Sequence, residues 1–182
     1  MNKRRWFLST TLLLLFSLML PVFAAKVKSQ VGKDANFAAY KTYQWLPPKV
    51  LTKTGVIEDH PLNPLVKEIV GQQLASKGLT EVADGGDLLV QVFVFTEPSP
   101  QLEAVFMAGM DPYMMYGTPV ATMGRYNHEG SLLLNLIERQ SNKSAWSAMA
   151  TKTLPKPPLK PDEVRKKLGQ AAADIFEKYP KK

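Results

Sequence analysis

The chain has 182 residues, a formal net charge of +7 and no cysteine. Without cysteine it can form no disulfide, no thiolate metal site and no cysteine nucleophile. Lys3, Arg4 and Arg5 carry three of the positive charges, so the rest of the chain is only mildly basic, at +4. Nucleic-acid binding usually needs a stronger basic surface, and we therefore expect no nucleic-acid partner.

The N-terminus has the three parts of a secretory signal peptide. Basic residues at Lys3–Arg5 precede an apolar run, Leu12–Leu20, and small side chains at Val22 and Ala24 suit a cleavage site. We expect cleavage after Ala24. The alternative is an uncleaved anchor over Trp6–Ala25, because these 20 residues are just enough to cross a bilayer.

This interpretation gives a signal peptide at residues 1–24 and a single mature domain at residues 25–182, which is long enough for a sizeable core. Arg4 and Arg5 also resemble a twin-arginine signal, whereas the leucine-rich run favours the general secretory route, and both routes stay open. No cysteine follows the apolar run. We therefore expect a periplasmic or otherwise exported protein that is not a lipoprotein.

The first part of the mature chain predicts two strands. Polar and apolar side chains alternate over Lys26–Val31, and a second strand is predicted over Lys41–Leu46. Turn-forming residues 34–40 separate the two strands. Pro47-Pro48 ends the second strand, and we interpret residues 49–61 as a polar loop.

A helix is predicted to begin at Asn63-Pro64, because asparagine suits the N-cap and proline suits the first helical position. Lys77 and Gly78 supply the signal that ends it. Its apolar stripe should lie on a sheet. The members of the stripe are Leu65, Val66, Ile69, Val70 and Leu74.

The stretch Asp87–Thr96 reads DLLVQVFVFT and predicts the central strand of a sheet. Its nearly continuous apolar and β-branched character is typical of a strand that is buried on both faces. Gln91 interrupts the apolar run. Because side chains alternate, one face would carry Leu88, Val90, Val92 and Val94, and the other Leu89, Phe93 and Phe95.

The C-terminal part predicts a hairpin and a second helix. His128–Glu138 and Lys143–Thr153 are the strands of the hairpin, and Trp146 is expected in the core. A proline-rich linker, Pro155–Pro161, leads to a helix that opens with Asp162-Glu163. Its apolar face comprises Val164, Leu168, Ala171, Ala172, Ile175 and Tyr179.

The predicted order of elements is ββαβββα. Runs of strands combined with two amphipathic helices indicate an α+β fold, built as a two-layer sandwich with a mostly antiparallel sheet.

Several short motifs occur in an order that resembles one bacterial family. They are Phe37–Pro48, Pro61–Asn63, Ala75–Leu79, Asp87–Val90, Glu129–Leu132 and Trp146. The similarity extends over about residues 26–180. On these motifs the chain resembles the family called domain of unknown function 4136.

The resemblance implies an exported bacterial envelope protein and carries no catalytic residue to transfer. Many members are lipoproteins, and this chain departs from that pattern because it lacks the cysteine. We therefore expect a non-catalytic binding or accessory domain without a cofactor. Its partner would be another envelope protein or a membrane surface.

A long segment, 98–127, is rich in methionine, tyrosine, glycine and proline. Connections of this length without secondary structure of their own are usually functional or disordered. The aromatic side chains in it suit contact with a partner, and they are Phe106, Tyr113 and Tyr116.

The same segment also suggests an alternative function. Thioether sulfur is a soft ligand that suits Cu(I), so an exported chain without cysteine could bind copper through methionines together with His128. The candidate ligands are Met107, Met110, Met114 and Met115. We favour the other use of methionine, an adaptable apolar surface for a partner or for the flank of the domain itself.

Catalytic motifs are not recognisable in the sequence, which has no HExxH, no GxSxG and no glycine-rich phosphate loop. His128 and Glu129 could form an acid–base pair, but adjacent strand residues point to opposite faces, so we interpret them as the start of a strand. His60 is interpreted as a solvated loop residue. We therefore expect no enzymatic activity.

Overall fold

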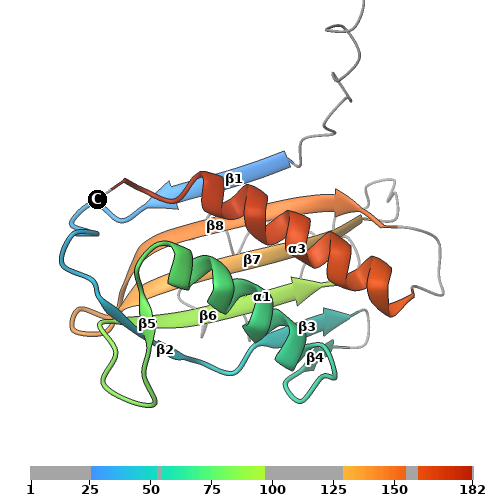
Figure 1. The fold of residues 1–182 in the computed structure, drawn as a ribbon, viewed down its shortest axis with the longest axis horizontal. Helices are drawn as coiled ribbons and strands as arrows, with labels where there is room; N and C mark the ends of the chain where they lie inside the picture. Colours follow the sequence, from blue (N-terminus) through green and yellow to red (C-terminus); the bar gives the residue numbers. More distant parts are fainter. Residues whose placement is uncertain (1–25, 53–54, 97–128, 155–159, 182) are drawn as a thin grey trace, which may run out of the picture.

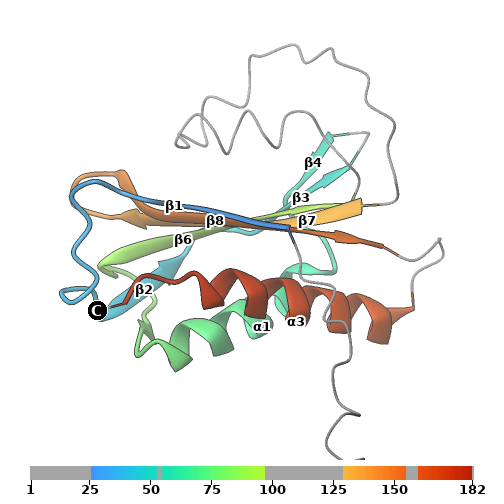
Figure 2. The same cartoon turned by 90° about the horizontal axis from the view of Figure 1, so that it is seen from above.

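The sheet carries both helices on one of its faces, as Figure 1 and Figure 2 show from two directions. This computed structural model describes residues 26–52, 55–96, 129–154 and 160–181. Within these ranges, the strands form one mixed, mostly antiparallel sheet. The predicted α+β two-layer sandwich is therefore confirmed.

Eight strands and two helices make up the described part of the chain. The strands are β1 (Lys26–Val31), β2 (Thr42–Trp45), β3 (Lys49–Thr52), β4 (Gly55–Ile57), β5 (Thr80–Glu81), β6 (Leu88–Phe95), β7 (Glu129–Glu138) and β8 (Lys143–Thr153). The helices are α1 (Asn63–Ser76) and α3 (Pro161–Glu177). The strand order is β1-β8-β7-β6-β2-β5, and β3 pairs with β4 and β6. Because β2 and β3 are parallel to β6, the sheet is mixed.

Strand β6 lies inside the sheet and is buried on both faces, as predicted. Val90 and Val92 are 0% exposed on the side of the helices. On the other side, Phe93 and Phe95 are 2% and 1% exposed. Alternate side chains of one strand therefore enter two separate apolar clusters.

The core between the helices and the sheet is centred on Trp146. This residue is fully buried, and its ring lies edge-on to Phe176 and Tyr179, with centroids 5.7 and 5.2 Å away. At the surface, Arg165 on α3 forms two hydrogen bonds to Glu68 on α1, at 2.7 and 3.2 Å. Neither described helix has the length and apolarity that a membrane-spanning helix needs.

The region 49–61, predicted to be a polar loop, contains a hairpin instead. Strand β3 pairs in parallel with the end of β6 and antiparallel with β4. Val50 is fully buried on β3, whereas β4 is exposed throughout. Strands this short depend on pairing with a neighbour, so local sequence does not reveal them. The observed order ββββαββββα has β3, β4 and β5 in addition to the predicted elements.

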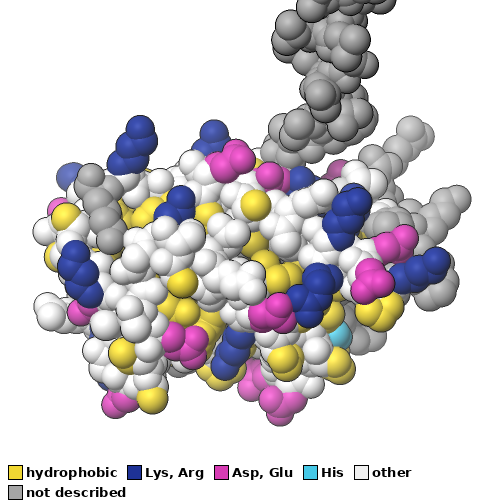
Figure 3. Space-filling view, viewed as in Figure 1, with side chains coloured by type: hydrophobic (Ala, Val, Ile, Leu, Met, Phe, Trp, Pro, Cys, Tyr) yellow, Lys and Arg dark blue, Asp and Glu magenta, His cyan; other side chains and the backbone are white. Residues whose placement is uncertain are grey.

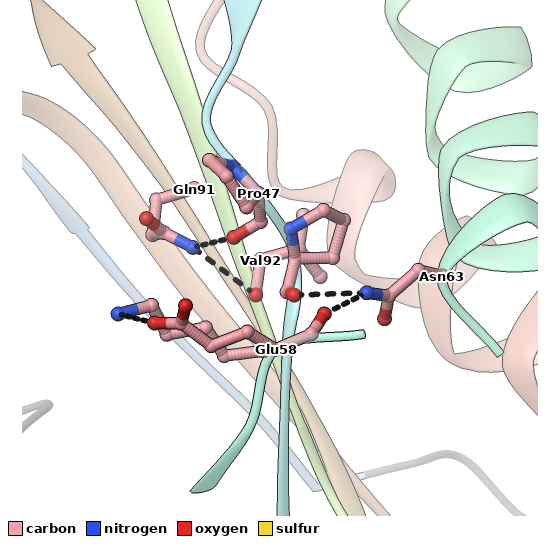
Figure 4. A network of polar contacts seen from close by, with 7 residues as sticks. Pro47, Glu58, Asn63, Gln91 and Val92 are labelled. Atoms are coloured by element: carbon pink, nitrogen blue, oxygen red, sulfur yellow. Dashed lines mark hydrogen bonds and ion pairs between the residues drawn. The ribbon is translucent and has the colours of Figure 1, made fainter. Parts of the chain in front are cut away.

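The prediction that Asn63 caps the first helix is wrong. Leu62 holds the N-cap position, and no side chain caps this end of α1. The side-chain amide of Asn63 instead donates hydrogen bonds to the carbonyl oxygens of Pro48, at 3.2 Å, and of Glu58 (Figure 4). Asn63 therefore connects the start of α1 to the β3–β4 hairpin.

Asp87 connects the start of β2 to the start of β6 through hydrogen bonds to its carboxylate. One of its carboxylate oxygens accepts hydrogen bonds from the backbone N–H groups of Lys41, at 2.8 Å, and Thr42, at 2.9 Å. The Thr42 hydroxyl donates a third, at 2.9 Å. These hydrogen bonds lower the pKa of the Asp87 carboxyl because they favour its charged form.

We expect the Asp87→Asn variant to be less stable than the original protein at neutral pH, by about 1 kcal/mol, because a charged acceptor is lost. A lowered pKa means that the carboxylate stabilises the fold above the usual aspartate value of 3.8, and that this contribution disappears as pH falls through the folded-state pKa. Urea unfolding at neutral and strongly acidic pH measures the difference. A difference that persists in acid would contradict this account. Asp84→Asn is the matched control, because Asp84 is highly exposed and its ion pair with Arg139 lies on the surface.

Gly86 allows β2 and β6 to approach closely. A Cβ atom at this position would lie 2.7 Å from both the Gln44 nitrogen and the Tyr43 carbonyl carbon, which are backbone atoms. We expect Gly86→Ala to destabilise the protein by about 1–3 kcal/mol in urea unfolding. Gly169→Ala is the control, because a Cβ at Gly169 in α3 meets no atom within 4 Å. That change should stabilise the helix by about 0.5–1 kcal/mol, and equal effects of the two variants would refute the packing argument.

Candidate functional site

The residues predicted to contact a partner or a metal lie outside the described residues. This applies to Phe106, Tyr113 and Tyr116, to Met107, Met110, Met114 and Met115, and to His128. The partner-contact and copper-binding predictions therefore stay predictions. Within the described ranges, no three histidine, aspartate or glutamate side chains gather as metal ligands.

Two of the sequence predictions concern described residues: Glu129 was a candidate for acid–base chemistry with His128, and His60 was expected to be a solvated loop residue. His60 is half-buried rather than solvated, and its Nδ1 accepts a hydrogen bond from the backbone N–H of Leu62 at 3.1 Å. This contact shapes the turn that leads into α1. Glu129 is the first residue of β7, where it lies opposite Thr153.

A pocket of about 110 Å³ opens between the first half of α3 and one end of the sheet. The helix contributes one wall, while the C-terminal ends of β6 and β8 and the start of β7 form the other. Most of its lining is apolar, and these residues are Leu62, Val94, Phe95, Leu132, Leu154, Val164, Leu168 and Ala171. Such a lining suits an apolar group.

A glycine shapes one wall of this pocket. A Cβ atom at Gly130 would lie 2.7 Å from Cδ1 of Leu154 and 3.1 Å from the carbonyl oxygen of Phe95. Glycine therefore lets the Leu154 side chain fold across the start of β7, where it lines the pocket. Gly130 belongs to the EGSL motif at residues 129–132. This motif predicted the start of the strand but gave no indication of the pocket.

Two of the charged groups at the pocket have structural partners. Lys152 Nζ lies 2.6 Å from Oδ2 of Asp174, and their side chains are only 15% and 26% exposed. The Glu163 carboxylate accepts a hydrogen bond from the backbone N–H of Lys160, which caps the start of α3. Lys167 contributes its side chain to the rim. This arrangement provides an apolar interior with a polar edge.

The size of the pocket limits what it can hold. Sites for drug-sized molecules usually enclose about 300–1,000 Å³. A cavity of about 150 Å³ lined by apolar side chains accepts benzene. A volume of about 110 Å³ therefore suits a single apolar side chain, such as leucine or methionine, and is smaller than the usual site for a drug-sized molecule.

A second feature lies on the opposite face of the sheet. Four polar side chains from four strands are aligned there by the register, because Gln30 pairs with Ser147, Ser147 with Asn135, and Asn135 with Gln91. We call these four residues the polar row. Asn135 is 0% exposed, Ser147 3% and Gln91 4%, so most of the row is buried.

The side chains of the polar row form some, but not all, of the hydrogen bonds that they could form. Asn135 Oδ1 accepts hydrogen bonds from the hydroxyls of Ser144, at 2.7 Å, and Ser147, at 2.9 Å. Gln91 Nε2 donates to the carbonyl oxygen of Pro47 at 2.9 Å (Figure 4). The Asn135 Nδ2 group, in contrast, has no hydrogen-bond acceptor among the described residues. A buried amide donor of this kind needs an acceptor from elsewhere.

Sequence reasoning found one member of the polar row and missed the alignment. Gln91 stood out because it interrupts an apolar strand, and Asn135 interrupts the apolar run LLLNLI in the same way. Nothing in the sequence indicated that these two strands pair or that the two polar residues lie opposite each other. The pairing of β6 with β7 is a tertiary property and brings them together.

The face that carries the helices has a mixed charge. Basic and acidic side chains are interspersed over it, as Figure 3 shows, without a large area of one sign on this view. The basic residue Arg165 on this face is paired with Glu68. The described part of this face therefore lacks the broad basic stripe that nucleic-acid binding proteins present.

A family model described as domain of unknown function (DUF4136) matches residues 27–181. This match spans nearly all of the region over which the sequence motifs suggested the resemblance. Among curated proteins, none matches the sequence.

Solved structures with a similar fold are distant in sequence. A DUF4136 family protein from Bacteroides thetaiotaomicron has a TM-score of 0.56 at 15% identity, over 86% of this chain and 96% of that one. A PDZ domain protein from Parabacteroides distasonis has a TM-score of 0.52 at 17% identity, over 87% of this chain but 36% of that one. The PelC dodecamer from Paraburkholderia phytofirmans has a TM-score of 0.48 at 11% identity, over 84% and 94%. At these identities the first two likenesses support the fold alone.

Proposed function

The chain belongs to the DUF4136 family, and on that premise we propose that it is a non-catalytic binding domain of the bacterial cell envelope. Two observations support an envelope location. The first 24 residues have the pattern of an export signal, and the motif resemblance implies a family of exported proteins.

The apolar pocket beside α3 is the main support for a binding function. Its volume of about 110 Å³ matches one apolar side chain, and its lining offers contact from α3 and from three strands. Burial of one such side chain contributes roughly 1.5–3 kcal/mol, which is enough to anchor part of an interface. The occupant that fits is an apolar side chain presented by a partner protein.

The charged groups around the pocket support binding rather than catalysis. Lys152 is paired with Asp174, and the Glu163 carboxylate is engaged at the start of α3. The two hydroxyls that line the pocket bond other groups than a base: Ser131 Oγ lies 2.9 Å from Thr151 Oγ1, and Thr96 Oγ1 donates to the carbonyl oxygen of Leu51. The groups available there hold the helix on the sheet.

The segment 98–127 is the second contact region in this proposal. Its aromatic residues Phe106, Tyr113 and Tyr116 are the types that dominate interface energetics. The pocket and the segment would then serve the same partner or two different ones. Photo-crosslinking with the reactive group at Tyr113 tests the segment separately from the pocket.

Photo-crosslinking from the pocket in the native envelope tests the proposal. A photoreactive amino acid replaces Lys167 at the rim, and we expect a protein adduct. A second substitution, Val164→Trp, fills the pocket and should reduce the yield of that adduct at least roughly tenfold, since one lost anchor of 1.4 kcal/mol corresponds to that factor. Val31→Trp is the matched control, because Val31 lies on β1 and is already 56% exposed.

The outcomes separate the alternatives. A protein adduct that is lost with Val164→Trp and kept with Val31→Trp supports the pocket as a protein-binding site. Adducts only with lipid would point to a membrane surface and overturn the protein partner. An adduct that Val164→Trp leaves unchanged would show that the pocket is not the contact. Circular dichroism of both tryptophan variants verifies that they fold.

A further inference from the structure

The face of the sheet opposite the helices is an interior surface without a described covering layer. Five apolar side chains form a cluster there, and they are Leu51, Phe93, Phe95, Leu133 and Met149. All five belong to strands. Figure 2 shows α1 and α3 together on the other side of the sheet, where their buried side chains join the first core cluster.

The side chains on this face have such low solvent exposure that another layer of protein must pack on them. Leu133 is 0% exposed, Phe93 2% and Met149 3%. Side chains on the outer face of a sheet are in contact only with neighbours in the same sheet, which leaves their outward ends accessible to water unless another layer packs on them. The low exposures of these side chains therefore indicate that a further layer packs on this face.

The covering layer can be inferred from the lengths of the undescribed segments and from their places in the chain. Residues 53–54 lie between β3 and β4, and residues 155–159 lead from β8 to α3 on the opposite face. Residues 1–25 have the signal-peptide pattern. Residues 97–128 follow β6 and precede β7, which are central, antiparallel neighbours. A hairpin connection between such strands needs about 2–5 residues, and this segment has 32.

We infer that the second face of the sheet is the docking surface for residues 97–128 of the same chain. The chemistry of the two partners is complementary. The apolar cluster offers aromatic and aliphatic side chains, and the segment holds five of the eight methionines, whose flexible side chains adapt to irregular apolar surfaces. In this arrangement, the side chains of the polar row contact the backbone of the segment rather than water.

The unpaired amide of Asn135 specifies how the segment docks. Its Nδ2 group is buried and has no acceptor among the described residues. A carbonyl oxygen of the segment supplies that acceptor, since a chain that packs on this face brings its backbone within reach of the polar row. Asn135 thus positions the segment, while Leu133 and Met149 supply apolar contact.

Intramolecular photo-crosslinking in the purified full-length mature chain tests the inference. An aliphatic photoreactive amino acid replaces Met149 in one variant and exposed Val31 in the other. We expect the probe at Met149 to crosslink within its own chain to peptides from residues 97–128, located by mass spectrometry. The probe at Val31 should give at least roughly tenfold less of these products, because yield follows contact. Crosslinks from Met149 to residues 155–159, to a second chain, or only to water would overturn the inference.

Oxidation of Met149 gives a second, independent readout. In the full-length chain Met149 should resist peroxide, since oxidation follows exposure. Replacement of residues 99–125 by a short glycine–serine linker should accelerate its oxidation at least roughly tenfold, whereas replacement of residues 155–159 should not. An unchanged rate after the first replacement, in a variant that keeps its circular dichroism spectrum, would refute the docking surface. Both tests use the protein without a partner, so their failure is distinct from failure of the proposed binding function.

Discussion

The architecture depends on the burial of β6 and β7 on both faces. A strand presents its side chains alternately to the two sides, so apolar residues at successive positions demand two covering layers. The helices supply one layer, over Val92 and its neighbours. Phe93, the next residue, is just as deeply buried on the other side. The position of both helices on one face of the sheet (Figure 2) follows from this constraint.

Polar groups within these layers fix the register of the sheet. The polar row crosses four strands at one level, and a shift of any strand by one residue would place its polar member against the apolar core of the helical side. The Ser147 hydroxyl on β8 donates a hydrogen bond to Oδ1 of Asn135 on β7. The cost of burying these groups is thereby partly offset, and alternative pairings of the strands are disfavoured.

The pocket is a consequence of how α3 meets the end of the sheet. The helix is held by the Lys152–Asp174 ion pair and by its apolar face, which includes Ile175 and Phe176 in the core. Towards the N-terminal end of α3, Val164 and Leu168 line the hollow between the helix and the strand ends. This hollow is the feature on which the proposed binding function rests.

The sequence by itself determined the features that arise from short-range periodicity. The strand pattern at Asp87–Thr96, the apolar stripes of both helices and the buried Trp146 were predictable, because side-chain alternation and helical spacing are local properties. Tertiary structure alone decided the β3–β4 hairpin, the alignment of Gln91 with Asn135, and the use of Asn63 as a tertiary hydrogen-bond donor. Each of these depends on the register of segments that are distant in the chain, and such a register is set by packing of the whole sheet, which no single segment encodes.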